Sequence, residues 1–428
     1  MFQPFARARD HYDSLPRIHD EICLHTRDYL GLPLLGAMEN PERNATLRVL
    51  IIRFIAKVHL FYPQARICLD KSASRKRSRP VALDSGRITG KPEVIPLRRQ
   101  SAPVHLILRQ IYLKLWRYVM RAVVLHEYGG PEKLKFEDNV PEPHISGSTV
   151  LIAAAAASVN PIDWKLRSGM RQKDSPLSFP AILGRDVSGI VRAVGANVKH
   201  FKAGDRVLAL SNATYAELVA VNDSDVAHLP DGVDLANAAA IPLISLTGDQ
   251  LVRLAAKVQK GQVVLITGAL GSVGRAAVHT AKKIGAQVIA GVRGKEMDDA
   301  RYLGVSDVLA IDDDDAIENF RLVDAIVDTV GGDVAAKLIA KVRQNGCFGY
   351  AATLPESAAA QNPTVKISRV RTQPDPSKLR EFADDVRDGK FVLPIGRRMP
   401  LRDAAEAHVL GEKGGIGKIL LLAPDSKE

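Results

Sequence analysis

The stretch LITGALGSVGRAAVHTAKKIG, residues 265–285, runs from an apolar strand-like segment through three closely spaced glycines into a helical pattern. Each of Gly268, Gly271 and Gly274 costs backbone entropy, so the chain must need their small size or their dihedral freedom at these places. A strand, a glycine-rich turn and a helix in this order place a pyrophosphate at the helix N-terminus, where free N–H groups and the helix dipole favour negative charge. The segment therefore predicts a dinucleotide-binding turn.

The glycines of this turn have separate tasks. Gly271 fits the point where the backbone approaches the phosphate, and Gly274 fits the point where the helix packs closely on the sheet. The first glycine of the usual G-x-G-x-x-G spacing is replaced by Ala269, which is small enough to keep the turn, and Gly268 stands one place earlier. The alternative is a turn without a ligand, but the strand before it and the apolar helix face after it favour nucleotide binding. The predicted cofactor-binding residues of the turn are Gly268, Ala269, Leu270, Gly271, Ser272, Val273 and Gly274.

The cofactor preference is predicted from the end of the next strand, 287–292. About 20 residues past the glycines, where the dinucleotide-binding pattern has an acidic residue for the ribose 2′-hydroxyl of NAD, this chain has Arg293, followed shortly by Lys295. The planar guanidinium of arginine instead accommodates the 2′-phosphate of NADP through paired hydrogen bonds. We therefore expect NADP(H), bound in part by Arg293 and Lys295. The alternative is that both residues are ordinary solvated charges.

Strand–helix alternation from about residue 240 predicts a doubly wound parallel sheet. Before it, short strand-like runs separated by Gly and Asp turns predict a barrel-like or sandwich-like β domain. A helix over 376–390 and a last strand over 418–422 complete the pattern, which is of the α/β class. The expected strands of the parallel sheet are 263–267, 287–292, 307–311, 324–330 and 346–352, with a possible edge strand at 364–371.

The excess positive charge is confined to the first part of the chain. Residues 1–119 hold 21 Lys and Arg against 10 Asp and Glu, so of the 59 basic and 48 acidic residues in the whole chain, 38 of each remain after position 119. The main body therefore has no basic footprint for nucleic acid. Three cysteines in 428 residues fit a reducing compartment rather than a disulfide framework. With no apolar run of about 18 residues and no recognisable targeting segment, no membrane association and a cytoplasmic location are expected.

Several motifs after Met120 resemble the medium-chain dehydrogenase/reductase superfamily, specifically its zinc-free quinone oxidoreductase (zeta-crystallin-like) branch. The motifs are MRAVVLHEYGGPEKL from 120, VNPIDWKLRSG (159–169), ILGRDVSGIVRAVGANVKHFKAGDRV (182–207), ITGALGSVG (266–274) and PLRDAAEAHVLGEKGGIGKILLL (400–422). The resemblance implies a GroES-like catalytic domain from residues 120–243 and 375–428, with a Rossmann NADP-binding domain, 244–374, inserted between them. It also implies a possible homodimer.

The zinc-dependent members of this superfamily need a thiolate in the segment that matches VNPIDWK and a His-Glu pair where this chain has Arg185 and Asp186. A catalytic zinc needs three N, S or O ligands, and arginine is not one of them. No catalytic metal is therefore expected. The run of four aspartates at 312–315 is interpreted as a solvated helix start rather than a metal cluster.

Without a metal to polarise a carbonyl, hydride transfer from NADPH needs an acceptor that is already electrophilic, and we expect a quinone. Reduction of an α,β-unsaturated aldehyde or ketone, and a low-turnover NADPH-binding or redox-sensing protein, remain as alternatives. The resemblance places Asn160 near the nicotinamide and substrate, and Thr247 beside the cofactor. The family often has a tyrosine where this chain has Lys165, which could donate to a developing oxyanion. Their alternatives are a turn residue for Asn160 and a solvated strand-end charge for Lys165, and Asp163 is expected to cap a turn.

Residues 1–119 lack a periodic core pattern, and the resemblance starts at a methionine. We expect this extension to lie outside the fold, either poorly ordered or derived from a start assigned too far upstream. The alternative is a basic appendage for a membrane surface or RNA.

Overall fold

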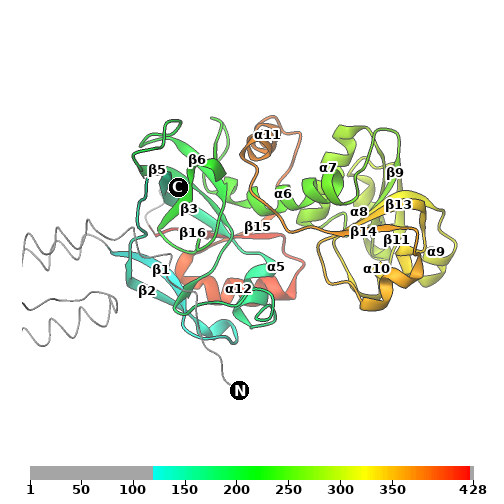
Figure 1. Ribbon diagram of the computed structural model, residues 1–428, viewed down its shortest axis with the longest axis horizontal. Helices are drawn as coiled ribbons and strands as arrows, with labels where there is room; N and C mark the ends of the chain where they lie inside the picture. The colour runs from blue at the N-terminus through cyan, green and yellow to red at the C-terminus, as the bar shows by residue number, and fades with distance from the viewer. Residues whose placement is uncertain (1–118, 425–428) are drawn as a thin grey trace, which may run out of the picture. The chain divides into compact units, whose positions relative to one another are not determined.

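The computed structural model describes residues 119–424, and the expectations for residues 1–118 lie outside that range (Figure 1). Within it, one parallel sheet and two mainly antiparallel sheets form a mixed α/β fold, which confirms the predicted fold class. No helix in residues 119–424 has the length and apolar character needed to cross a membrane.

The parallel sheet has six strands in the order β11-β10-β9-β12-β13-β14. Every neighbouring pair is parallel, and the strand order reverses direction between β9 and β12, so the predicted doubly wound sheet is confirmed. The predicted edge strand is β14. The strands are β9 (Val263–Thr267), β10 (Gln287–Val292), β11 (Asp307–Ala310), β12 (Val323–Asp328), β13 (Val342–Tyr350) and β14 (Lys366–Arg369).

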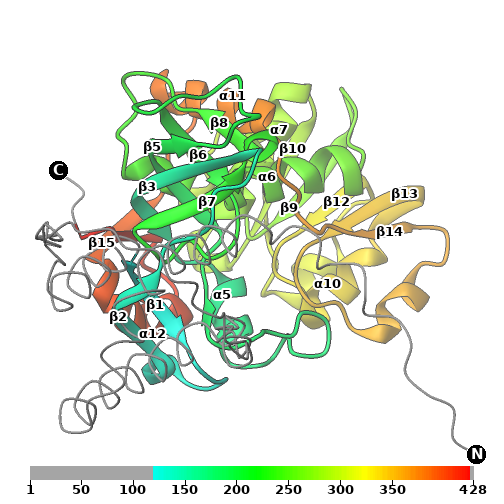
Figure 2. The same cartoon turned by 60° about the vertical axis from the view of Figure 1, so that its left-hand side comes forward.

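Alternate residues of these strands face two separate apolar cores. Val264 and Ile266 of β9 belong to the core under α7, whereas Leu265 between them belongs to the core under α10. The two helices therefore cover opposite faces of the sheet, as Figure 2 shows. The helices connecting the strands are α7 (Ser272–Ile284), α8 (Met297–Arg301), α9 (Asp314–Glu318) and α10 (Gly332–Ile339).

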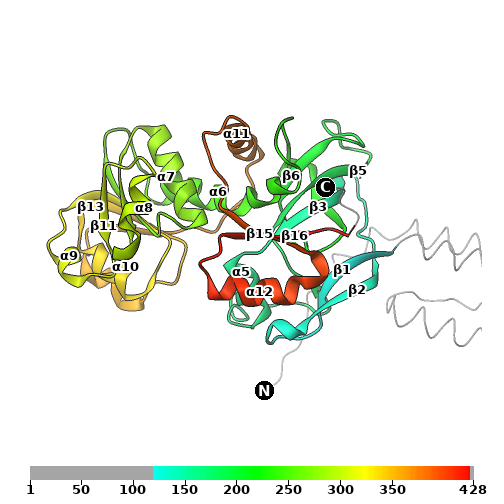
Figure 3. The ribbon, with the colours of Figure 1, turned by 180° about the vertical axis from the view of Figure 1, so that it is seen from behind.

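The β domain contains a seven-stranded sheet of order β15-β16-β3-β5-β6-β8, with β7 also paired to β3, and a small sheet β2-β1-β4. Strand β16 is antiparallel to β3, with Leu420 opposite Ser158, so the last strand lies among the first ones (Figure 3). The strands are β1 (Val119–Leu125), β2 (Leu134–Pro141), β3 (Thr149–Ser158), β4 (Ala181–Ile182), β5 (Asp186–Val194), β6 (Arg206–Leu210), β7 (Leu218–Asn222), β8 (Val226–His228), β15 (Ile395–Pro400) and β16 (Lys418–Leu422).

Four further helices pack on the β domain, and one of them, α6, also packs on α7. The apolar residues of α11 pack with Leu246 of α6 and with strands β6 and β8. These helices are α5 (Pro161–Arg167), α6 (Pro242–Gln250), α11 (Pro376–Arg387) and α12 (Ala404–Lys413). A π-helical turn (Leu251–Ala255) and short 3-10 turns complete the described elements; the latter are Pro131–Lys133, Asp223–Asp225, Asn237–Ala240, Gly294–Glu296, Glu356–Gln361 and Leu401–Asp403.

Two local features can be compared with the sequence expectations. Asp313 accepts hydrogen bonds from the backbone N–H groups of Asp315 and Ala316, so the aspartate run starts helix α9 as predicted. Lys165, however, does not stand at a strand end. It lies in α5, because Asn160 has extended backbone at the N-cap and Pro161 is suited to the first helical position.

Candidate active site

The glycine turn connects β9 to α7. Gly268 has a left-handed backbone with φ +61°, and a Cβ there would lie 2.5 Å from Thr329 Oγ1. The N–H of Gly271 donates to the Gly268 carbonyl at 2.8 Å and closes the turn. The residue that makes the tight turn is therefore Gly268, whereas Ala269, at the expected first-glycine position, is a fully buried packing residue.

The other two glycines differ in what an added side chain would meet. A Cβ on Gly274 would overlap the Gly268 carbonyl and would lie 2.8 Å from Ala269 Cα, so helix and turn can touch only without a side chain. A Cβ on Gly271 would meet only the Gly268 oxygen, at 3.1 Å. Gly271 is the N-cap of α7 and brings no side-chain cap, so the helix N-terminus keeps donors for a phosphate. The residues fit a dinucleotide at this turn.

The neighbouring strand ends are tied together by Asp328, which the sequence reasoning missed. Its carboxylate accepts from Thr267 Oγ1 at 2.7 Å and from the Gly331 N–H at 2.9 Å. Burial raises the pKa of Asp328, while these hydrogen bonds oppose the shift. The carboxyl ends of β9 and β12 are thereby held at the point where the strand order reverses, which is where doubly wound sheets bind ligands.

Arg293 and Lys295 lie at the end of β10, on one short turn. The exposed guanidinium of Arg293 is paired with Glu296, which raises the pKa of Arg293. On the same turn, the Gly294 N–H donates to Asp312 Oδ1 at 2.7 Å. The guanidinium thus lies at the surface with one carboxylate partner already in place.

Thr247 lies on α6, an element that the sequence analysis did not predict. Its hydroxyl donates to the Leu243 carbonyl at 2.6 Å and shares a hydrogen bond with Thr372 Oγ1 at 2.7 Å. The next residue, Gly248, lets α6 approach α7 closely, because a Cβ there would lie 2.8 Å from the Val273 carbonyl oxygen. Thr247 is therefore adjacent to the contact between α6 and the first turn of α7.

Asn160 is 1% exposed, and its amide is engaged on both sides. Its Nδ2 donates to Asp186 Oδ2 at 2.7 Å and to the Ser158 carbonyl at 3.2 Å. Its Oδ1 accepts from the ammonium of Lys418. In the structure the Asn160 side chain thus hydrogen-bonds to several protein groups. Its contact with nicotinamide or substrate stays a prediction.

Asp186 connects the Asn160 side chain to the start of α6. It is fully buried and accepts at Oδ2 from Asn160 and from the Ser158 hydroxyl. At Oδ1 it accepts from the Leu243 N–H at 2.6 Å. Because α6 packs on α7, a short series of contacts runs from Asn160 to the helix that begins at the glycine turn.

A second buried chain of hydrogen bonds begins at Asp163. Its Oδ2 accepts from the Asn160 N–H at 2.8 Å and from the Tyr215 hydroxyl at 2.9 Å. Tyr215 lies 3.2 Å from His408 Nε2, and His408 Nδ1 lies 3.1 Å from the Arg167 guanidinium. Arginine only donates, so Nδ1 accepts, and a neutral His408 carries its proton on Nε2 and donates to Tyr215. The expected turn cap at Asp163 is thus part of a longer network.

Burial sets the protonation states in this chain. Burial raises the pKa of Asp163 to about 7, against the hydrogen bonds from Asn160 and Tyr215 that lower it. Burial lowers the pKa of His408 to about 3, and the nearby Arg167 guanidinium acts in the same direction. Burial also raises the pKa of Tyr215 well above its usual value. His408 is therefore neutral over the whole physiological range.

Lys165 is half-buried on α5, and its ammonium has no hydrogen-bond or ion-pair partner among residues 119–424. On the helix it lies one turn after Pro161 and therefore on the same face, whereas Asp163 and Arg167 are buried. Lys165 is thus not part of the network around Asp163, and its role at the acceptor stays a prediction.

The residues at the zinc-ligand positions do not fit a metal. Arg185 donates to Asn212 Oδ1 at 2.8 Å, and Asp186 is saturated by protein donors. The ammonium of Lys418 lies 3.9 Å from Asp186 Oδ2, where its charge would oppose a divalent cation. Among the residues that the structure describes, no group of three His, Cys, Asp or Glu side chains is placed to hold a metal ion.

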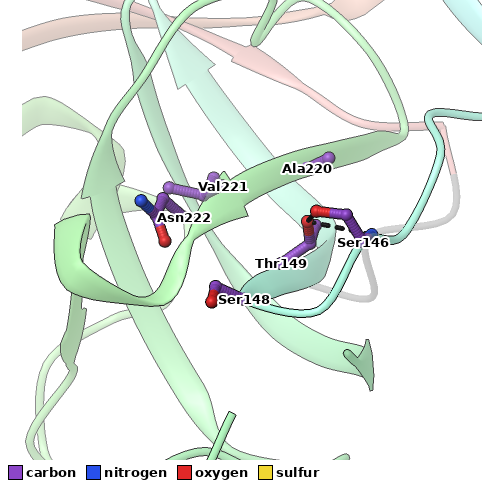
Figure 4. Close-up of a pocket in the computed structure, with 6 residues that line it drawn as sticks. All are labelled: Ser146, Ser148, Thr149, Ala220, Val221 and Asn222. Carbon is purple, nitrogen blue, oxygen red and sulfur yellow. Dashed lines mark hydrogen bonds between the residues drawn. The ribbon is translucent and has the colours of Figure 1, made fainter. Parts of the chain in front are cut away.

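A separate pocket lies at the other end of β3, lined by the residues drawn in Figure 4. There the Ser146 and Thr149 hydroxyls share a hydrogen bond of 2.8 Å. None of its lining residues takes part in the glycine turn or in the buried network, and we assign it no role. The lining residues are Ser146, Ser148, Thr149, Ala220, Val221 and Asn222.

Two protein families match parts of this fold. The alcohol dehydrogenase GroES-like domain matches residues 146–231, and the family described as zinc-binding dehydrogenase matches residues 303–421. Quinone oxidoreductase of Rattus norvegicus is 30% identical over 326 residues, which cover 71% of this chain and 98% of that protein. The mitochondrial NAD(P)H oxidoreductase RTN4IP1 of Mus musculus is 36% identical over 238 residues, which cover 50% of this chain and 60% of that protein.

Solved structures show the same architecture. The quinone oxidoreductase from Coxiella burnetii has a TM-score of 0.65 and 29% identity, covering 71% of this chain and 99% of that one. A mycobacterial protein complexed with NADPH has a TM-score of 0.61 and 28% identity, with the same coverage.

A GroES-like β domain with a Rossmann sheet and a glycine turn that fits a dinucleotide defines an oxidoreductase that uses a nicotinamide cofactor. The chain belongs to the medium-chain dehydrogenase/reductase superfamily, and over most of its length it is a quinone oxidoreductase-like member.

Proposed function

We propose that this protein transfers a hydride from NADPH to a quinone without a catalytic metal. Two structural features that occur together in this fold support the proposal. One is a glycine turn that leaves the α7 N-terminus open to a phosphate, and the other is a buried Asn160–Asp186–Lys418 cluster where metal-dependent relatives need ligands. An acceptor reduced without Lewis-acid help must be electrophilic in itself, as a quinone is.

The chain's own residues would hold the cofactor and assist the acceptor. The Gly268–Gly274 turn and the N–H groups of α7 would bind the pyrophosphate, with Thr247 beside it and Arg293 and Lys295 at the 2′-phosphate. When bound, the nicotinamide supplies the hydride. We propose that Lys165, whose ammonium has no protein partner in the described range, donates a hydrogen bond or proton to the acceptor oxygen.

The test is NADPH oxidation with 1,4-benzoquinone, with a 2-alkenal and without an acceptor. Turnover of the quinone supports the proposal, and Lys165→Met should then lower kcat with little change in the KM for NADPH. Turnover of the alkenal alone would replace the quinone reductase with the enone reductase alternative. NADPH binding without turnover of either acceptor would leave a nucleotide-binding protein.

Arg293 is expected to set the preference for NADPH. Arg293→Ala removes a charge-assisted contact to the 2′-phosphate, for which about 1.5–3 kcal/mol is typical, so the KM for NADPH should rise about tenfold or more. The KM for NADH should not change. Arg301→Ala is the matched control, because Arg301 is also an exposed arginine paired with an acid three residues away, Asp298. Equal changes in the KM for NADPH and NADH, or the same effect from Arg301→Ala, would show that Arg293 does not bind the 2′-phosphate.

A further inference from the structure

Lys418 is the first residue of β16, and it is buried, with 4% of its surface exposed. Its ammonium donates to the Val159 carbonyl at 3.0 Å and to Asn160 Oδ1, and it lies 3.9 Å from Asp186 Oδ2. Burial lowers the pKa of Lys418, while the charges of Asp186 and Asp163 oppose that shift. A buried ammonium is costly unless it is paired and hydrogen-bonded, so its place beside Asn160 calls for an explanation.

The ammonium determines which way the Asn160 amide faces. Lysine can only donate, so the amide oxygen must face Lys418 and the amide nitrogen must face Asp186 and the Ser158 carbonyl. If the amide were turned over, its NH₂ would face the ammonium and its oxygen would face the carboxylate. Both of those pairs are unfavourable, so one orientation is strongly preferred.

Asp186 passes this constraint on to α6. Its second oxygen accepts from the Leu243 N–H at 2.6 Å, at the start of the helix that carries Thr247 and packs on α7. Lys418 therefore connects the junction between β3 and α5 with the helix that lies against the cofactor-binding element. These segments are far apart in the sequence, and Lys418 lies 258 positions from Asn160.

We propose that Lys418 is a positioning residue for hydride transfer. Its ammonium fixes the orientation of the Asn160 amide and balances the charge of the Asp186 carboxylate. It thereby holds the β3–α5 junction at a fixed position relative to α6. It supplies a fixed protein cation in the cluster where zinc-dependent relatives place metal ligands. This inference rests on the proposed function, because it assigns the geometry of the same site.

The test compares Lys418→Met with Lys413→Met, an exposed lysine at the end of α12. Lys418→Met should lower kcat at least tenfold and leave the NADPH dissociation constant within about twofold, because the glycine turn is untouched. Lys413→Met should change neither quantity. An unchanged kcat in Lys418→Met would overturn the proposal.

A double variant separates positioning from simple charge balance. Lys418→Met alone leaves the buried Asp186 without its cation, so its melting temperature should fall. Lys418→Met with Asp186→Asn removes both charges, so the melting temperature should recover in part, because the new NH₂ group still leaves one buried donor without its acceptor. The kcat should stay low, because nothing restores the amide orientation. Recovery of kcat together with stability would show that Lys418 serves charge balance only, and would overturn the positioning role.

A readout without turnover keeps this test independent of the acceptor. In protein labelled with ¹⁵N-asparagine, the side-chain amide signal of Asn160 can be assigned by its loss in Asn160→Ser. It should shift in Lys418→Met and stay unchanged in Lys413→Met, whether or not NADPH is present. A wild-type protein without turnover would count against the proposed function alone, whereas an unmoved Asn160 signal would count against Lys418.

Discussion

Gly274→Ala is expected to destabilise the protein severely and to abolish NADPH binding. The added Cβ would overlap the Gly268 carbonyl and would lie 2.7 Å from its carbon and 2.8 Å from Ala269 Cα. All three are backbone atoms of the glycine turn, so they cannot give way as a flexible side chain would. Overpacking of this kind costs about 3 kcal/mol, and the melting temperature should fall by on the order of 10 °C.

Gly271→Ala in the same turn is the matched comparison. Gly271 has φ −70° and ψ 162°, which alanine adopts readily, and its Cβ would meet only the Gly268 oxygen at 3.1 Å. Stability should therefore stay within about 1 kcal/mol of the wild type. The methyl group would still stand where a pyrophosphate approaches, so the NADPH dissociation constant should rise at least tenfold.

Thermal unfolding of the two variants measures the loss of stability, and NADPH titration measures the loss of cofactor affinity. If Gly274→Ala melted like the wild type, the close approach of α7 to the turn would be wrong. If Gly271→Ala bound NADPH normally, the pyrophosphate would lie elsewhere on the helix end.

His408 and Asp163 are expected to affect the pH dependence of stability in opposite directions. The pKa of His408 falls from 6.5 to about 3 on folding, so its contribution is complete above pH 6.5 and is lost as the pH falls toward 3. The pKa of Asp163 rises from 3.8 to about 7, so its contribution is complete below pH 3.8 and is lost as the pH rises through 7. Between these limits the two slopes, each about 1.4 kcal/mol per pH unit, nearly cancel.

Replacing either His408 or Asp163 should reveal how the other one changes the free energy of unfolding with pH. In His408→Gln the free energy of unfolding, relative to the wild type, should increase by about 3 kcal/mol from about pH 6.5 to about pH 4.5. In Asp163→Asn it should decrease by a similar amount over the same range. Each variant also loses buried contacts, which shifts its whole curve by a constant amount, so the slope carries the information.

Urea unfolding at several pH values measures these slopes directly. Variant curves that run parallel to the wild-type curve would mean that neither group is held in the protonation state that burial favours. A shared slope in both variants would instead point to other titrating residues.

Local sequence patterns were sufficient to predict those strands and turns whose conformation depends on neighbouring residues in the sequence. The strand preceding the glycines and the next one, β9 and β10, have the predicted bounds, because their apolar runs end at turn residues. Gly274 could be assigned to close helix packing from its spacing alone, and the structure gives it those contacts. The same spacing placed the tight turn at Ala269 rather than Gly268, because it counts positions and does not show which residue takes a positive φ.

The buried networks could not be predicted because their partners are distant in sequence. Lys418 opens the run KILLL and looks like a surface charge at a strand start, yet it bonds to Asn160. His408 and Tyr215 are separated by 193 positions. The signal that was available is weak: a single charged residue at the start of a strongly apolar strand. Nor did the pattern predict α6, whose apolar residues are almost entirely buried and show little amphipathic contrast.

The pairing of β16 with β3 has a consequence for the order of synthesis. The ribosome releases the strands of the β domain up to β8 first, then the whole parallel sheet, and only afterwards β15 and β16. During that interval β3 lacks one neighbour at residues 156–158, and Asp186 lacks its cation. The parallel sheet can fold as its own strands emerge, whereas the β domain must wait for Lys418, which follows its partner Val159 by 259 positions. Contacts of such long sequence separation form slowly, so we expect the Asn160–Asp186–Lys418 cluster to form last, when Lys418 arrives.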